Sequence, residues 1–387
     1  MRVAVVSPSV DRSHGTERAL AELLEGLASH PKLEIHLYAQ RVADVQMTLD
    51  RSGSFVWHRV PSIPGPHLFR FVFWFLLNRL CRAWHSAIRG LRFDVVFSAG
   101  INCSDANVVL VHAVFHRLAE LAGSAPLSGL RDVHQRLYYR LLRFLEQRIY
   151  CDPRVRLAAV SGHTRSELLQ YFGRTDVPVI PNGVDAVYFS PEKLTILRDS
   201  ARARWNFRPD ETVLLLIGND WRTKGLPILL EALSLCGDLL LRALVVGQEN
   251  PDFFLRRALG LGIRDRLRFA RPEHDVRVFY SAADILVAPS LEDSFNLPVL
   301  EAMSCGLPVI VSKNAGVSEW LHPGQDAFVL RDPGSAQQLA GMLRLIVQRD
   351  RMRLMGGNAV GTARGLSWDR HVAGVFSLLQ NAVHRRT

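Results

Sequence analysis

The stretch EDSFNLPVLEAMSCGLPV, residues 292–309, directly follows a short apolar run, DILVAPS at 284–290. The run is typical of a buried strand. LPVLEAM predicts a helix from about Pro298, because proline is tolerated in the first helical turn, and Gly306 is a natural stop. A helix that begins at the carboxyl end of a buried strand presents unpaired backbone N–H groups, which bind anions. The stretch therefore predicts a strand, loop and helix of an α/β fold with an anion site between them.

Two carboxylates flank this predicted anion site. Asp293 lies in the loop before the helix, and Glu301 lies one turn inside it. Carboxylates accept hydrogen bonds from hydroxyl groups such as those of a ribose or a sugar ring. An anion between two hydroxyl-rich groups describes a nucleotide sugar, so we expect the two side chains to bind different parts of one such ligand. The alternative is that Asp293 only caps the helix and Glu301 is a solvated helix residue.

A second candidate anion ligand lies in GNDWRTKG, residues 218–225, directly after the apolar run VLLLI. Lys224 is one of only four lysines among 47 basic residues, and we expect it between a strand and the next helix. A lysine there acts as a point charge that can bind phosphate, and Arg222 can add to it. The alternative is a solvated loop lysine.

Strand-like and helix-like stretches alternate along the whole chain, which is typical of parallel sheets covered by helices. One set begins at VAVVS near the amino terminus, with Thr16 as the expected N-cap of its first helix, and a second begins at ETVLLLIG, residues 211–218. The stretch 186–210 between them loses its apolar periodicity and contains two prolines. We therefore predict an amino-terminal domain at 1–185, a linker at 186–210, a carboxyl-terminal domain at 211–367, and a final amphipathic helix at 368–387 that packs back on the first domain.

Composition excludes several classes of protein. The 387 residues are 48% hydrophobic and 22% charged, which excludes a disordered chain, and the longest apolar run, FVFWFLL at 71–77, is too short to cross a bilayer. The five cysteines form no CxxC pair, so we expect a reducing, cytoplasmic compartment and neither disulfides nor a zinc site. The net charge of +10 favours anionic partners, but no nucleic-acid-binding motif accompanies it.

Six segments together resemble one known family. They are HGTER at 14–18, AVSGHTRSEL at 159–168, VIPNGVD at 179–185, KG at 224–225, YSAADILVAPS at 280–290 and DSFNLPVLEAMSCGLPVI at 293–310. The chain resembles family 4 glycosyltransferases, and in particular those that build bacterial lipopolysaccharide core or exopolysaccharide. The resemblance implies the GT-B fold, in which two Rossmann-like domains face each other across a cleft. It also implies a retaining transfer from a nucleotide sugar.

The resemblance assigns donor-binding roles in the second domain. The family's two acidic residues, separated by seven positions, match Asp293, for hydroxyls of the transferred sugar, and Glu301, for the ribose. Asp293 is one carbon shorter than the family's glutamate, which bears on the identity of the sugar. Lys224 and Arg222 would hold the diphosphate; the family's frequent arginine after the strand glycine is Asn219 here. The remaining candidates are a turn in which Asn296 replaces a frequent glycine and adopts its left-handed conformation, the neighbouring Phe295 and Leu297, and Arg271 near the base.

Two candidates lie in the first domain. Gly15 matches the family's glycine loop, where a missing side chain lets the backbone approach the donor phosphates. A histidine near the reacting centre matches His112, which follows the apolar run VVLV, while His116 is expected to be structural. The expected catalytic residues are thus His112, Lys224 and Asp293. No Asp-any-Asp motif occurs, so we expect neither metal nor other cofactor, and the departing phosphate itself would deprotonate the acceptor hydroxyl.

The acceptor is expected in the first domain, as a glycan or glycolipid. The stretch 68–93 contains five arginines and no acid among aromatic residues, and 131–148 contains five arginines and two acids. Such stretches can dock on an anionic membrane surface, which would place the protein on the inner face of the cell membrane. The alternative is ordinary helices that pack on the first sheet. For the whole chain, the rivals are a protein that binds nucleotide sugars (UDP-, GDP- or ADP-linked) without catalysis, a sugar-nucleotide epimerase, and a phosphorylase.

Overall fold

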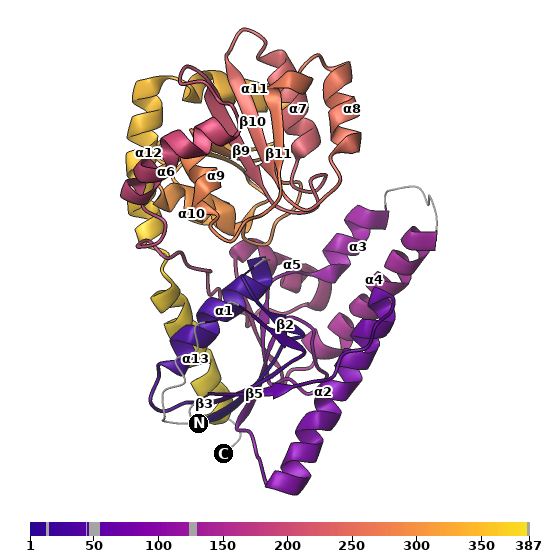
Figure 1. Ribbon diagram of the computed structural model, residues 1–387. Coiled ribbons are helices and arrows are strands. Elements are labelled where there is room, and N and C mark those ends of the chain that lie inside the picture. The colour runs from indigo at the N-terminus through magenta and orange to yellow at the C-terminus, as the bar shows by residue number, and fades with distance from the viewer. Residues whose placement is uncertain (13–14, 44, 46–54, 124–129, 385–387) are drawn as a thin grey trace. The chain divides into compact units, whose positions relative to one another are not determined.

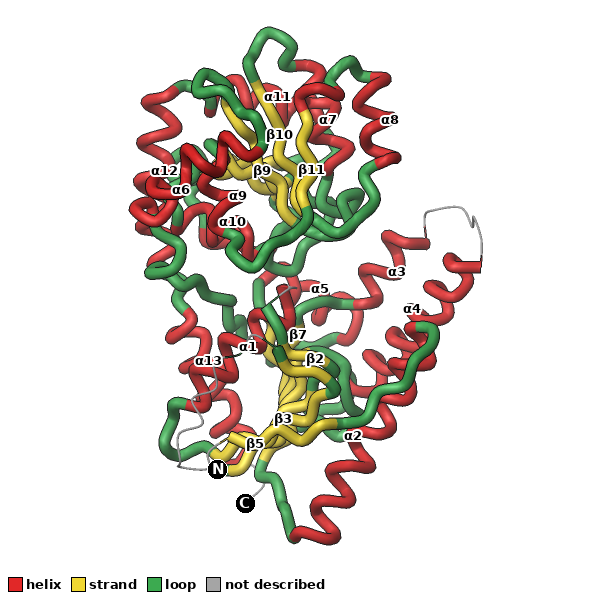
Figure 2. Tube along the Cα trace, viewed as in Figure 1, coloured by secondary structure: helices red, strands yellow, loops and turns green. Residues whose placement is uncertain are grey.

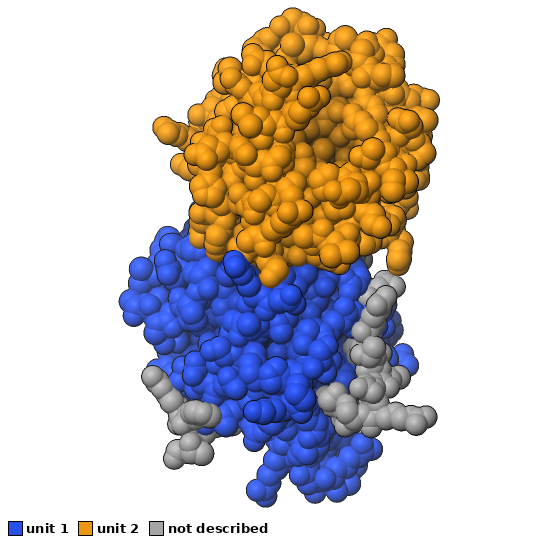
Figure 3. Space-filling view, turned by 90° about the vertical axis from the view of Figure 1, so that its left-hand side faces the viewer, with its two compact units in different colours: residues 1–181, 368–387 blue, residues 182–367 orange. Residues whose placement is uncertain are grey.

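The computed structural model describes residues 1–12, 15–43, 45, 55–123 and 130–384. The chain forms two compact units, which are described one at a time (Figure 1, Figure 3). Unit 1 contains residues 1–181 and 368–387, and unit 2 contains residues 182–367. The first boundary, at residue 181, lies four residues before the expected position 185. The second, at residue 367, lies at the expected position.

Unit 1 is built on a parallel six-stranded sheet with the order β5-β3-β1-β6-β7-β8, drawn in yellow in Figure 2. Its central strands are apolar and buried on both faces because helices cover each face, as in VVLV of β7. The strands are β1 (Arg2–Val6), β3 (Glu34–Ala39), β5 (Phe55–Arg59), β6 (Val95–Ala99), β7 (Val108–Val111) and β8 (Arg156–Ala159), with β2 (Ser9–Val10) and β4 (Arg41–Val42) in a separate pair. The helices are α1 (Gly15–Ala28), α2 (His67–Arg89), α3 (Phe115–Gly123), α4 (Leu130–Tyr150), α5 (Gly162–Phe172) and α13 (Trp368–His384).

The final helix α13 packs on α1, the first helix of the chain. The rings of His30 and Phe376 lie 4.0 Å apart. A Cβ atom on Gly26 would lie 2.4 Å from a methyl group of Val372, so a residue without a side chain lets the two helices approach closely. α1 begins at Gly15, and Thr16 therefore lies in its first turn instead of at the N-cap expected from the sequence.

Unit 2 repeats the same architecture, with a parallel sheet in the order β11-β10-β9-β12-β13-β14. Its core consists of aliphatic side chains from the strands and from α7, such as Leu216 and Leu229. The strands are β9 (Thr212–Ile217), β10 (Leu241–Val246), β11 (Leu267–Ala270), β12 (Ile285–Ala288), β13 (Val309–Ser312) and β14 (Ala327–Leu330). The helices are α6 (Pro191–Arg204), α7 (Leu226–Leu235), α8 (Asp252–Gly260), α9 (Arg277–Ala282), α10 (Leu297–Ser304), α11 (Ala336–Ile346) and α12 (Arg349–Arg364), with short 3-10 turns at Arg264–Arg266 and Gly316–Trp320.

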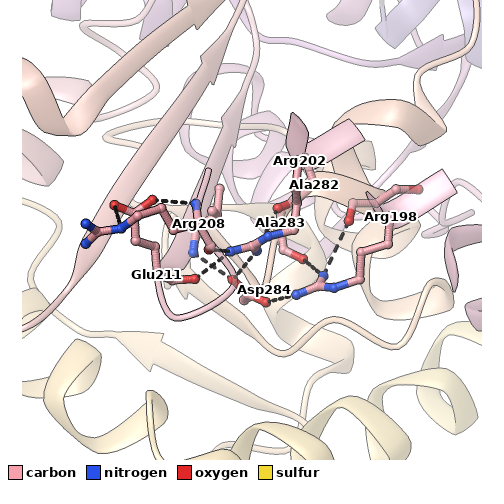
Figure 4. Close-up of polar contacts among 9 residues, drawn as sticks. Arg198, Arg202, Arg208, Glu211, Ala282, Ala283 and Asp284 are labelled. Atoms are coloured by element: carbon pink, nitrogen blue, oxygen red, sulfur yellow. Dashed lines mark hydrogen bonds and ion pairs between the residues drawn. The ribbon is translucent and has the colours of Figure 1, made fainter. Parts of the chain in front are cut away.

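The stretch 186–210, expected to be a linker, differs from that expectation because most of it is helix α6, which packs on α9. Figure 4 shows the polar contacts that hold it. Arg198 and Arg202 bind the two carboxylate oxygens of Asp284 at 2.6 and 3.1 Å, and Val213 N–H donates to the same carboxylate at 2.7 Å. Arginine side chains make these contacts, so the stretch shows little apolar periodicity although it belongs to unit 2.

Replacing Asp284 by asparagine should destabilise unit 2 by about 3 kcal/mol, because Arg202 would keep its buried charge without a counter-ion. Urea unfolding measures the loss. Asp210→Asn is the matched control, since Asp210 is 60% exposed and pairs with Arg208 at the surface, where an ion pair contributes at most about 1 kcal/mol. Equal unfolding midpoints for the two variants would contradict a structural role for the Asp284 contacts.

Beneath α2, unit 1 contains a cluster of three histidines and a tyrosine. His36 Nδ1 and His58 Nε2 lie 2.8 Å apart, and the hydroxyl of Tyr38 lies 2.8 Å from His85 Nδ1. The rings of Tyr38 and His58 are stacked with centroids 4.6 Å apart. Burial, with smaller contributions from the nearby His85, His36 and Arg89, lowers the pKa of His58 to about 4. The imidazole of His58 is therefore neutral at pH 7.

Because the folded pKa of His58 lies below its unfolded value, the unfolded chain binds its proton first as the pH falls. The free energy of unfolding should therefore decrease between about pH 6.5 and pH 4. His58→Phe keeps a ring against Tyr38 and should make this decrease less steep. The exposed His274, replaced in the same way, is the control. A slope in His58→Phe equal to that of the unchanged protein would refute the effect.

Candidate functional site

Two loops of unit 2 leave neighbouring strands at the same edge of the sheet. The strand order puts β9 between β10 and β12, so the direction of chain progression reverses between β9 and β12. In open parallel sheets, ligands bind at the carboxyl ends of the strands at such a reversal. The loop from β9 to α7 carries Lys224, and the loop from β12 to α10 carries Asp293. Both candidates from the sequence therefore lie where this fold places ligands.

Lys224 and Asp293 bind each other. Lys224 Nζ lies 2.5 Å from Asp293 Oδ2, and the two side chains are 26% and 10% exposed. The sequence predicts that each binds a different part of a ligand, whereas here the two charges form one ion pair. A partly exposed ammonium group beside one carboxylate can still accept an anion on its open side. The ion pair and the 26% exposure of Lys224 argue against the alternative of a solvated loop lysine.

Direct backbone contact between the loops brings these two side chains together. Leu291 N–H donates to the carbonyl oxygen of Thr223 at 2.8 Å. Gly225 has φ +81°, and a Cβ atom there would lie 2.1 Å from the carbonyl oxygen of Pro289. Only glycine meets both conditions without strain, so Gly225 permits the approach of the two loops and thereby the ion pair.

The turn before α10 has the predicted left-handed residue. Asn296 has φ 76° and ψ 73°, its side chain is buried, and its amide donates to Ser290 Oγ at 3.4 Å. Pro298 lies in the first turn of α10, as expected. Asp293 also shapes this turn, since the N–H of Phe295 donates to its Oδ1 at 3.3 Å. Lys224 lines one small pocket together with Asn296 and Pro298, so the start of α10 lies close to the lysine.

Asn296→Ala should destabilise the protein by about 1–2 kcal/mol, because alanine pays the full steric cost of the left-handed conformation. Asn296→Gly should cost clearly less, since glycine adopts positive φ without strain. The melting temperatures of the two variants are compared. Both variants lose the side-chain amide of Asn296, so the difference between them measures the backbone strain alone. Similar losses in both would show that the side-chain contact with Ser290, not the backbone, sets the cost.

Glu301 lies inside α10 with its side chain 5% exposed, which excludes the alternative of a solvated helix residue. The hydroxyl of Tyr280, on α9, donates to Glu301 Oε2 at 2.6 Å. Tyr280 is itself buried, so it holds the carboxylate in one orientation. Sequence reasoning missed Tyr280, because no spacing rule links α9 to α10. The only signal was its position at the start of the motif YSAADILVAPS.

The remaining candidates of unit 2 do not join the ion pair. The guanidinium of Arg222 stacks over the ring of Phe253 at 4.5 Å. Arg271 is exposed directly after β11, two strands away from β9. Phe295 is buried against Trp320, with ring centroids 5.6 Å apart, and Leu297 is buried at the start of α10. Asn219 accepts a hydrogen bond from the N–H of Gln248 at 2.9 Å.

Unit 1 contains the other two candidates. His112 follows β7 and lines a cavity of about 300 Å³ together with Gly100, Arg70 and Tyr138. Burial lowers the pKa of His112 to about 3, with a smaller contribution from His371, so its imidazole is neutral at pH 7. Gly15 is the exposed first residue of α1, and a Cβ atom built there would meet no protein atom within 4 Å.

His116 is structural, as expected. Its Nδ1 lies 2.6 Å from Glu146 Oε2, and the backbone N–H groups of Phe115 and His116 donate to the same carboxylate at 2.7 and 2.9 Å. Glu146 is fully buried, and burial raises its pKa to about 8. This carboxyl group caps the start of α3, a role that the sequence did not indicate.

Two protein-family models match the chain, one in each half. Residues 13–188 match the model described as Glycosyltransferase Family 4, and residues 198–359 match the model described as Glycosyl transferases group 1. The chain belongs to glycosyltransferase family 4. The two matched regions contain all the candidates named above.

Curated relatives in the family share about three residues in ten. The D-inositol 3-phosphate glycosyltransferase of Nocardia farcinica is 30% identical over 238 residues, which cover 57% of this chain and 51% of that protein. The protein of the same name from Geodermatophilus obscurus is 31% identical over 282 residues, which cover 69% of this chain and 60% of that protein. The matched part thus spans between half and three fifths of these relatives' own length.

Solved structures of similar fold are GT-B glycosyltransferases. WaaG, a glycosyltransferase involved in lipopolysaccharide biosynthesis, superimposes with a TM-score of 0.79 and 19% identity over 97% of this chain and 99% of its own. Sucrose-phosphate synthase from Thermosynechococcus elongatus gives 0.77 and 20% over 98% of each chain. Anabaena HepE in complex with UDP-glucose gives 0.70 and 18%, over 97% and 99%. At these identities the likeness shows the fold alone, and the predicted GT-B fold is confirmed.

The family membership does not by itself connect the chain to a membrane. Within the described residues, no helix is both long enough and apolar enough to cross a bilayer.

Proposed function

We propose that this chain is a retaining glycosyltransferase that moves a sugar from a nucleoside-diphosphate sugar to a glycan or glycolipid acceptor in cell-surface polysaccharide assembly, at the cytoplasmic face of the membrane. The observation that carries the proposal is the pairing of Lys224 with Asp293 at the reversal of strand order in unit 2. It unites a cation for a diphosphate with a carboxylate for sugar hydroxyls, and the buried Glu301 lies on the helix that follows.

The donor would lie with its diphosphate against Lys224 and the first N–H groups of α10, where the left-handed Asn296 turns the chain into the helix. Asp293 would accept hydrogen bonds from the transferred sugar and Glu301 from the ribose. Leu297 would contribute the backbone N–H group of the same turn, while the N–H of Phe295 holds Asp293 in place. Because HepE was solved with UDP-glucose, a UDP-sugar is our first choice of donor over GDP- and ADP-sugars.

Two arginines have supporting parts in this proposal. Arg222 would leave the ring of Phe253, or reach past it, to neutralise the diphosphate together with Lys224. Arg271, exposed at the end of β11, would lie beside the base. Gly15 in unit 1 leaves open space where a side chain would otherwise stand, which suits close approach of a phosphate to the backbone.

The proposed reaction needs neither metal nor protein nucleophile. The acceptor hydroxyl attacks the anomeric carbon from the face that the nucleotide leaves. The bond from that carbon to the diphosphate oxygen breaks, and the proton of the hydroxyl passes to the departing phosphate. Lys224 stabilises the negative charge that develops on the leaving group. His112, neutral at pH 7, can hydrogen-bond a sugar hydroxyl in the cavity of unit 1 without adding charge.

The acceptor site in this proposal is the cavity of unit 1. Its volume of about 300 Å³ suits a small sugar unit, and its lining combines the cationic Arg70 with the aromatic Phe71 and Tyr138. Aromatic faces and a guanidinium group suit a sugar that carries a phosphate or carboxylate. WaaG is described as acting in lipopolysaccharide biosynthesis and the curated relatives as acting on inositol 3-phosphate, so both kinds of acceptor should be tried.

Saturating concentrations of the correct nucleotide should raise the melting temperature. At 100 times the dissociation constant the gain is about 2.7 kcal/mol. We expect UDP to give the largest shift among UDP, GDP and ADP. Glu301→Ala should abolish the shift, because the ribose loses its acceptor, while Glu231→Ala, on an exposed part of α7, should keep it. No shift with any nucleotide would contradict the assignment of the donor site.

Turnover separates transfer from the rival functions. Release of UDP from a UDP-sugar, dependent on an added acceptor and lost in Lys224→Met, would support the transferase. Conversion of one UDP-sugar into another without release of UDP would instead indicate an epimerase. Nucleotide binding without any turnover across the acceptor panel would indicate a binding protein.

A further inference from the structure

Helix α2 has a buried face that fixes it to unit 1. Trp74, Asn78 and Arg82 are buried there. Arg82 donates to both oxygens of Asp105, at 2.9 and 2.8 Å, and to Asn78 Oδ1 at 2.9 Å. The sequence alone suggested that all five arginines of residues 68–93 belong to a basic surface. Arg82 is instead an internal anchor.

The opposite face of α2 is apolar and open to solvent. We call it the α2 stripe: five large apolar side chains that are each 60–64% exposed, namely Phe69, Leu76, Leu80, Trp84 and Ile88. The last four follow a spacing of four residues, which places them along one side of the helix. Single exposed apolar residues are ordinary, but a continuous row of them marks an interaction surface. Figure 1 shows α2 as a long helix at the border of unit 1.

The charges around the stripe have one sign. α2 contains no acidic residue, and its exposed charged residues are Arg70, Arg79 and Arg89. The described side chains of the neighbouring α4, residues 133–150, repeat the combination, since the single acid there, Glu146, is fully buried. The exposed apolar and arginine residues of α4 are Val133, Leu137 and Phe144 with Arg136, Arg140, Arg143 and Arg148.

We propose that the α2 stripe docks unit 1 on an anionic phospholipid bilayer. A helix of 23 residues, roughly 35 Å long, with one apolar face and arginines beside it is suited to lie in the plane of the interface. The apolar side chains enter the boundary of the acyl chains, and the guanidinium groups reach the lipid phosphates. A second copy of the chain fits less well, because joining two stripes would bring like charges together.

Docking would also serve the proposed reaction. His67, Arg70, Phe71 and Trp74, at the start of α2, line the cavity assigned to the acceptor. A docked α2 would bring that cavity close to lipid headgroups, so a lipid-linked acceptor could be used at the membrane surface. This consequence rests on the proposed function, whereas the docking itself does not.

Vesicle sedimentation with the purified full-length protein tests the docking. Vesicles of phosphatidylcholine alone are compared with vesicles in which part of it is replaced by phosphatidylglycerol. We expect binding to the anionic vesicles to be at least about tenfold tighter and to weaken at high salt. The double variant Leu80→Ser with Trp84→Ser should lose at least about tenfold in this binding. Leu354→Ser, which removes a comparably exposed side chain of α12 in unit 2, should bind like the unchanged protein.

Three outcomes would overturn the proposal. One is equal binding, or none, to both kinds of vesicle. Another is loss of binding in Leu354→Ser as large as that in the double variant. The last is self-association of the free protein in analytical ultracentrifugation that disappears in the double variant, which would assign the stripe to a second copy. The double variant should keep the melting temperature and the nucleotide-induced shift of the unchanged protein, so that failure of docking and failure of the donor site remain distinguishable.

Discussion

The backbone contact between Gly225 and Pro289 is the constraint on which the candidate donor site depends. A single methyl group at Gly225 would collide with the carbonyl oxygen of Pro289, and the two loops would separate. With the loops in contact, Lys224 and Asp293 meet although 69 positions divide them in the chain. The strand order is the second requirement. It makes β9 and β12 neighbours in the sheet, so the loops that follow these two strands lie side by side.

Carboxyl groups with little exposed surface recur in both units, and each has a fixed set of partners. Glu301 receives the hydroxyl of Tyr280, Asp284 binds two arginines and a backbone N–H, and Glu146 receives two backbone N–H groups and a histidine. A carboxyl group buried without such partners would destabilise the fold by several kcal/mol, and burial raises the pKa of Glu146 to about 8 even with its partners in place. Two of these carboxylates organise the protein itself, while Glu301 lies on the helix that borders the candidate donor site.

Arginines of this chain serve at least three physical purposes, and a net charge of +10 does not distinguish them. Arg82 and Arg202 are internal anchors that tie a helix to a neighbouring loop through an aspartate. Arg222 stacks on an aromatic ring at the rim of the candidate site. Arg79 and Arg89 remain exposed beside a row of large apolar side chains. Only the last kind creates the positive surface that the overall charge suggests.

Local patterns in the sequence were sufficient for the two parallel sheets, the start of α10 at its proline and the left-handed Asn296, because each depends on periodicity or on the conformational preference of one residue. The joint occurrence of several short motifs was also sufficient for the family. The tertiary structure decided which groups meet: Lys224 with Asp293, Tyr280 with Glu301, and Arg198 with Asp284. It also decided that 186–210 is mostly a packed helix and that Arg82 faces inward. Such contacts join residues far apart in the chain, and no local period or propensity records them, because they arise only when the sheets bring distant loops and helices together.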